Sequence, residues 1–91
     1  MTGFELKEKR QLLGASITDV ICELEKMGIH TTKQTLSAIE RMDDASSSAT
    51  AYLYLGALGK IFLQVDPMII EANVLSSFAK RRLQDAETNS K

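Results

Sequence analysis

The stretch from Thr31 to Arg41 carries polar side chains at a spacing that suits base recognition in DNA. Gln34, Ser37 and Arg41 lie at positions i, i+3 and i+7, so they share one face of a helix. In the major groove, Gln can form two hydrogen bonds with adenine, Lys or Arg can pair with guanine, and a hydroxyl can contact a base or a phosphate. The same spacing is typical of an ordinary amphipathic surface helix, and this stretch alone leaves both interpretations open.

The opposite face of that stretch is apolar and carries one charge. Leu36 and Ile39 are three residues apart and suit a core, and Glu40 falls on the same inward side. Arg10 likewise lies in the apolar stripe of the first predicted helix. Because a charge on an inward face is costly unless an opposite charge meets it, we predict an ion pair between Arg10 and Glu40.

The composition is that of one small helical domain without a strong charge. The 91 residues include 44% hydrophobic and 25% charged residues and one proline. The formal net charge of −1 counts mildly against nucleic-acid binding, because a protein that neutralises phosphates usually has a basic face. It does not exclude such binding, since the local field at one surface matters more than the sum.

The single cysteine and the short apolar runs bear on the compartment. Cys22 has no partner for an internal disulfide, so it fits a reducing compartment, and we expect it in the core. No run approaches the ~18 apolar residues of a membrane span. Glu5 and Glu8 interrupt the region where a signal peptide needs an apolar stretch. We therefore expect a cytoplasmic, nucleoid-associated protein with no membrane segment.

Apolar periodicity and capping residues predict five helices. Ser16 with Asp19 three residues later is a capping-box pattern, and Asp66 followed by Pro67 marks another helix start. On the second helix we expect Glu23 to face solvent with its charged neighbours. The predicted helices cover residues 4–13, 17–27, 31–41, 49–63 and 67–83.

The fourth predicted helix contains two glycines. Leu55, Leu58 and Phe62 form the side that we expect to face the core, with Tyr54 and Ile61 close by. Gly56 and Gly59 each cost about 1 kcal/mol relative to Ala in a helix interior. Either they permit close helix packing or the helix is less regular than predicted.

These features together resemble the helix-turn-helix domains of lambdoid phage repressors, Cro proteins and related bacterial regulators. The closest run is T-T-x-Q-[ST]-[IL]-x-x-[IL]-E, which corresponds to residues 31–40 here. The resemblance covers about residues 4–70 and includes the Arg10–Glu40 pair and the turn at Gly28. The turn at residues 27–31 is about two residues longer than the tight form of the family, and Ile21 replaces its usual Ala.

The resemblance implies an all-α, five-helix lambda-repressor-like DNA-binding domain over residues 1–83. The third helix would enter the major groove, and the second would bridge to the backbone with its N-terminus facing a phosphate. The protein would then be a repressor that binds a palindromic operator as a dimer. The expected base contacts are Lys33, Gln34, Ser37 and Ala38, and the expected backbone contacts are Ser16, Thr18, Thr32 and Arg41.

The fifth predicted helix offers more apolar surface than a small four-helix core needs. Ile70, Val74 and Phe78 form one stripe with Leu75 beside it, and we expect this stripe to contact a second copy of the chain. Residues 84–91 are polar, and we predict a flexible tail there.

One further function class follows from the same pattern. The fold could instead serve as a protein-interaction module, such as an antitoxin or anti-regulator, whose fifth helix binds another protein. Enzyme activity is not expected, because the sequence has no Gly-rich phosphate loop and no Cys/His cluster. His30 is the one histidine, and a single ligand cannot hold a metal, so no cofactor is predicted.

Overall fold

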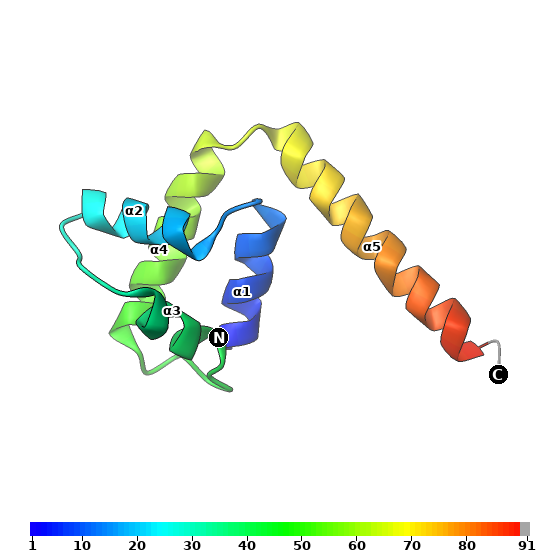
Figure 1. Cartoon of the computed structure of the whole chain (residues 1–91), viewed down its shortest axis with the longest axis horizontal. Helices are drawn as coiled ribbons and strands as arrows, with labels where there is room; N and C mark the ends of the chain where they lie inside the picture. Colours follow the sequence, from blue (N-terminus) through cyan, green and yellow to red (C-terminus); the bar gives the residue numbers. More distant parts are fainter. Residues whose placement is uncertain (90–91) are drawn as a thin grey trace.

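Regular secondary structure in the described part of the chain is all helical, which confirms the predicted all-α class. The computed structural model describes the backbone of residues 1–89 and the side chains of residues 1–81. The helices nearer the N-terminus lie together, and the C-terminal helix runs away from them (Figure 1). The helices are α1 (Gly3–Leu12), α2 (Ile17–Lys26), α3 (Lys33–Glu40), α4 (Ala49–Gln64) and α5 (Pro67–Asn89).

Helices α1 to α4 pack around one hydrophobic core. Each fully buried Leu or Val side chain contributes about 1.5–3 kcal/mol relative to an exposed one. All four helices supply large buried side chains, so the loss of any one helix would expose apolar surface on the others. The largest fully buried side chains are Leu6, Val20, Leu24, Leu36 and Tyr54.

The predicted caps are present at the starts of α2 and α3. The Oγ of Ser16 accepts a hydrogen bond from the Asp19 N–H at 3.1 Å, and the Asp19 carboxylate accepts one from the Ser16 N–H at 2.8 Å. The Oγ1 of Thr32 accepts from the Thr35 N–H at 3.2 Å. Such caps accept hydrogen bonds from backbone N–H groups that the first helical turn leaves free. Each cap stabilises the folded protein by about 1 kcal/mol.

Glycines with a positive φ end α1 and α2. Gly14 has φ +70° and Gly28 has φ +81°, a conformation that costs other residues steric strain. After α2, the Ile29 N–H donates to the Leu24 carbonyl at 2.9 Å, which is the long hydrogen bond of a Schellman motif. Gly28 therefore sets the direction in which the chain leaves α2 for α3.

The inward face of α4 differs from the predicted one. Leu58 is buried, but Leu55 is 37% and Phe62 is 56% exposed. The sequence pattern misplaced the stripe because apolar residues occur on every side of this helix, so their spacing does not single out one face. The residues of α4 that are buried are Ala51, Tyr54, Ala57, Leu58 and Ile61.

Two residues of α2 also depart from expectation. Glu23 was expected in solvent but is only 6% exposed, and its Oε1 accepts from Lys26 Nζ at 3.1 Å and from Gln64 Nε2 at 3.4 Å. Cys22 was expected in the core but is exposed. The buried carboxylate is tolerated at the contact with α4 because two polar side chains, Lys26 and Gln64, donate hydrogen bonds to it.

Helix α5 is longer than predicted and stands apart from the other four. It continues past the expected end at residue 83 to Asn89, so most of the predicted tail 84–91 is helical; residues 90–91 lie outside the described residues. Its described contacts to α1 include a hydrogen bond from Asn73 Nδ2 to the Leu12 carbonyl at 2.9 Å. The radius of gyration is 15.0 Å. A compact domain of this length has about 12 Å.

Among the described residues, no single helix is long and apolar enough to cross a membrane. The α4 helix and residues 67–81 of α5 meet that criterion only when taken as a pair, with a bend of 115° between them.

Gly3 makes a close approach that the sequence did not reveal. Its N–H donates to the Met42 carbonyl at 2.9 Å, and the Ala45 N–H donates to the Met1 carbonyl at 2.8 Å. These bonds bring the start of α1 against the chain that leaves α3. A Cβ at Gly3 would collide with the Ile39 carbonyl oxygen.

We predict that Gly3→Ala destabilises the protein by roughly 1–3 kcal/mol, because backbone atoms must shift to admit the methyl group. Chemical denaturation measures the change in the free energy of unfolding. The control is Gly56→Ala in α4, where an added Cβ meets nothing within 4 Å. That control should be stabilising by up to about 1 kcal/mol. Equal stability of the two variants would contradict the close approach.

Candidate nucleic-acid interface

Helix α3 is fixed to the core by one face and open to solvent on the other. Leu36 is fully buried and Ile39 is 5% exposed, so both lie in the core. Lys33, Gln34 and Ala38 are exposed on the other side of the helix. The helix thus has the two-faced arrangement that its sequence spacing predicts.

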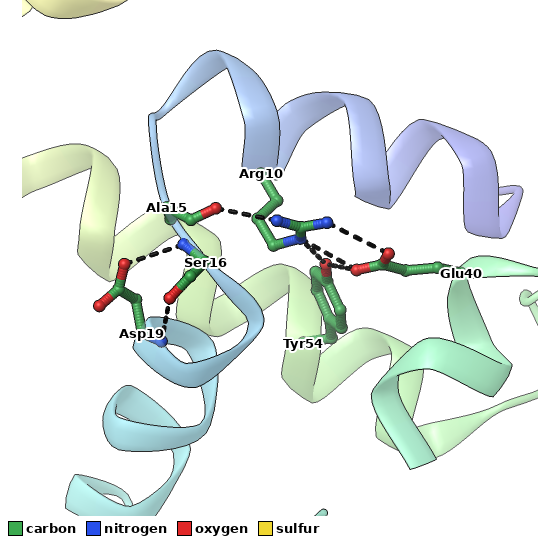
Figure 2. A network of polar contacts seen from close by, with 6 residues as sticks. All are labelled: Arg10, Ala15, Ser16, Asp19, Glu40 and Tyr54. Atoms are coloured by element: carbon green, nitrogen blue, oxygen red, sulfur yellow. Dashed lines mark hydrogen bonds and ion pairs between the residues drawn. The ribbon is translucent and has the colours of Figure 1, made fainter. Parts of the chain in front are cut away.

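A buried polar network joins the C-terminal end of α3 to α1 and α4. Arg10 Nε donates to Glu40 Oε2 at 3.0 Å, and Arg10 Nη2 donates to Glu40 Oε1 at 3.3 Å. Figure 2 shows this two-pronged pair, with the guanidinium also reaching the Ala15 carbonyl at 2.9 Å through Nη1. The two side chains are 12% and 7% exposed. The ion pair predicted between Arg10 and Glu40 is therefore present, and it is largely shielded from solvent.

Tyr54 is the member of this network that the sequence did not reveal. Its hydroxyl donates to Glu40 Oε2 and accepts from Arg10 Nε at 3.2 Å. Burial, followed by the hydrogen bond and negative charge of Glu40, raises the pKa of Tyr54 far above its usual value of 10.0. The spacing of a tyrosine in an apolar helix can indicate whether the ring lies in the core or at the surface. It does not indicate whether the hydroxyl has a polar partner.

The pKa of Arg10 is also raised. Desolvation by burial acts to lower it, but the hydrogen bond and charge of Glu40, with a smaller contribution from Tyr54, outweigh that effect. No described buried side-chain nitrogen or oxygen lacks a hydrogen-bond partner. The network is thus fully satisfied, which is the condition under which a buried charge pair is tolerated.

All of the predicted DNA contacts lie at the surface. Among the described residues, the side chains of Lys33, Gln34 and Arg41 form no hydrogen bond or ion pair. Their polar groups are therefore available to an external ligand. Ser37 is partly buried, and the other predicted contacts are exposed; these are Ser16, Thr18, Thr32, Lys33, Gln34, Ala38 and Arg41.

Two of these residues already have structural partners. The hydroxyl and N–H of Ser16 are both engaged with Asp19, and the Asp19 carboxylate lies at the N-terminus of α2. The Asp19 carboxylate already interacts with the positive end of the α2 dipole, so a phosphate that approaches this N-terminus would meet a negative charge. Thr32 Oγ1 bonds both the N–H and the Oγ1 of Thr35, the latter at 3.0 Å.

Negative charge also follows α3 directly. Asp43 and Asp44 are exposed just after Arg41. Hydrogen bonds from Ser46 lower the pKa of Asp44, so this carboxylate stays ionised at neutral pH. Lys33 and Arg41 place one positive charge at each end of α3, and the two aspartates partly offset the charge of Arg41.

Among the described residues, no group of three or more His, Cys, Asp or Glu side chains is placed to hold a metal ion. Comparison of the chain with protein-family models, with curated proteins and with solved structures gives no match. Functional assignment therefore depends on the geometry of the chain itself.

We predict that removing either member of the Arg10–Glu40 pair destabilises the protein by roughly 3–5 kcal/mol, because the remaining charge is left shielded and unpaired. In a double-mutant cycle of Arg10→Met and Glu40→Met, the coupling energy should be about 0.5–3 kcal/mol. The control cycle uses Glu8 and Arg81, an exposed pair at 3.2 Å, for which about 0–1 kcal/mol is expected. Additive effects at Arg10 and Glu40 would contradict a coupled pair.

The raised pKa of Tyr54 predicts a loss of stability at high pH. Below pH 10.0 the phenol is neutral in both folded and unfolded chains, whereas above it the unfolded chain ionises first. The free energy of unfolding should therefore fall as the pH rises past this value. Denaturation at several alkaline pH values should show a shallower fall in Tyr54→Phe than in the original chain. Identical slopes would show that Tyr54 does not contribute.

Proposed function

We propose that this protein binds double-stranded DNA sequence-specifically as a dimer and acts as a transcriptional regulator, most simply a repressor. In this proposal the domain is of the lambda-repressor-like type and α3 is its recognition helix. The observation that carries it is the anchoring of α3. Leu36, Ile39 and Glu40 hold its inner face, while its outer face presents polar side chains without partners in the described structure.

The polar groups on the outer face of α3 match the chemistry of the major groove. Lys33 and Gln34 lie in its first turn, which is the part of a recognition helix that reaches base edges. Gln34 would pair with adenine, and Lys33 with guanine or a phosphate. Arg41 at the other end and Thr18 on α2 would contact the backbone and set the position of α3.

A dimer would place two such helices on one DNA duplex. Half-sites of a palindromic operator are about 34 Å apart, which corresponds to one helical turn. The predicted interface residues of α5 are consistent with a dimer, because Val74, Leu75 and Phe78 are 47%, 61% and 59% exposed in the single chain. Ile70 is partly buried.

Selection from random DNA sequences with the purified full-length protein tests this function. The selection is carried out at about 150 mM salt, where non-specific binding is weak. Recovery of a two-fold symmetric site, bound at least about a thousandfold more tightly than unrelated DNA, is the expected result. Weak retention of all sequences would overturn the proposal.

We predict that Gln34→Ala weakens binding to the selected site by about 1–3 kcal/mol and relaxes preference at one base pair, because a two-pronged contact to adenine is lost. Binding titrations on the site and on its single-base variants measure both effects. Gln11→Ala is the matched control, since Gln11 is also exposed but lies on α1. Equal weakening on all sequences would instead make Gln34 a phosphate contact.

A second candidate function is a protein-interaction module, such as an antitoxin or anti-regulator. The observation that favours it is the amount of exposed apolar surface on α4 and α5, which includes Leu63 at 83% and Met68 at 74%. Size-exclusion chromatography with light scattering separates the two proposals. A monomer that selects no DNA sequence would favour a different protein partner.

A further inference from the structure

An apolar groove lies between α1 and α4 and is distinct from the surface of α3. Its volume is about 460 Å³, and Lys9 is the one charged residue among those that line it. Of the α5 side chains that the structure describes, only Ile70 belongs to the lining. We call this feature the α1–α4 groove; it is lined by Lys9, Leu12, Leu13, Leu55, Leu58, Gly59, Phe62 and Ile70.

A glycine keeps the groove open on the side of α4. A Cβ at Gly59 would meet nothing within 4 Å, so no described part of this chain requires a glycine there. Alanine would favour the helix more. Phe62 beside it is 56% exposed, although apolar side chains of this size are usually buried. A glycine next to exposed apolar side chains leaves room for the close approach of another element.

Helix α5 carries a convex apolar ridge of matching character. Met68, Glu71 and Leu75 are spaced i, i+3 and i+7 and so follow one side of the helix. Met68 and Leu75 are 74% and 61% exposed. The bond from Asn73 to α1 uses a different side of α5, and the bundle leaves most of Met68 and Leu75 uncovered.

We infer that the α1–α4 groove of one protomer receives the α5 ridge of a second copy, and that the contact is reciprocal. The inference deepens the dimer of the proposed function and does not depend on DNA binding. A concave apolar groove and a convex apolar helix are complementary in shape, as in other helix-in-groove contacts. A two-fold axis would repeat the contact, so that each α5 fills the other protomer's groove and no open chain of copies forms.

Charge supports a second copy as the occupant. Glu71 lies within the α5 ridge, and Lys9 lines the groove, so the two surfaces carry opposite charges. Phe62 in the groove and Leu75 on the ridge are each more than half exposed, so apolar surface is available on both sides of the contact.

The groove is tested by Gly59→Gln, because a Cβ at residue 59 meets nothing within 4 Å in the protomer and the longer side chain would occupy the groove. The control is Gly56→Gln, because Gly56 is equally open but does not line the groove. In sedimentation or light-scattering titrations of the full chain, the Kd of the dimer should rise roughly 10-fold to 100-fold for Gly59→Gln. It should stay within a few-fold for the control. Circular dichroism should show that both variants keep their helix content.

The α5 ridge is tested by Leu75→Gln. The control is Ser76→Gln, because Ser76 is exposed and lies on the side of α5 that carries Asn73. Leu75→Gln should weaken the dimer to a similar degree, and Ser76→Gln should not. When Gly59→Gln and Leu75→Gln protomers are mixed, one of the two groove contacts is intact again. The mixture should therefore associate more tightly than either variant alone.

Three results would overturn the inference. They are a monomeric original chain at all concentrations, a dimer unaffected by Gly59→Gln, and a mixture that associates no better than its components. The last two would indicate contact between two α5 helices or between two α4 helices. A dimer that behaves as expected but selects no DNA sequence would leave the inference standing and overturn the proposed function instead.

Discussion

The buried contact of Arg10 with Glu40 and Tyr54 is the interaction on which the rest of the bundle depends. A shielded guanidinium is tolerated only when its donors are used, and here they reach Glu40 on α3, Tyr54 on α4 and the Ala15 carbonyl before α2. One cation thus joins four segments of the chain. Because these hydrogen bonds are directional, they fix the orientation of α3 more tightly than apolar packing alone would.

That orientation determines which side chains of α3 face solvent. With Leu36 and Ile39 in the core and Glu40 held by Arg10, the outer face presents Lys33 and Gln34 without described partners. Caps at both ends of the connection, Thr32 before α3 and Gly28 after α2, restrict the helix further. A rigid helix with free polar groups is suited to reading a fixed pattern of donors and acceptors, which supports the DNA-binding proposal.

Apolar surface is distributed unevenly over the molecule. The four-helix bundle buries its inner faces, yet α4 and α5 leave large apolar side chains in solvent, among them Phe62, Leu63 and Leu75. Helix α5 extends beyond the bundle and adds little to the core. Such a helix gains stability mainly from packing against another surface, which is the physical basis for proposing a second copy.

Local chemistry determined much of this protein in advance. The sequence predicted the five helices and the capping box at Ser16, because apolar periodicity and caps depend on residues close together in the chain. It also predicted the pairing of Arg10 with Glu40, because an unpaired charge on an inward face is costly. Tertiary structure alone decided the rest. Which face of α4 is buried, the buried position of Glu23, the role of Tyr54 and the close approach at Gly3 depend on what packs opposite. A helix that is apolar on all sides carries no sign of its neighbour, and a glycine does not show whether open space or another backbone lies beside it.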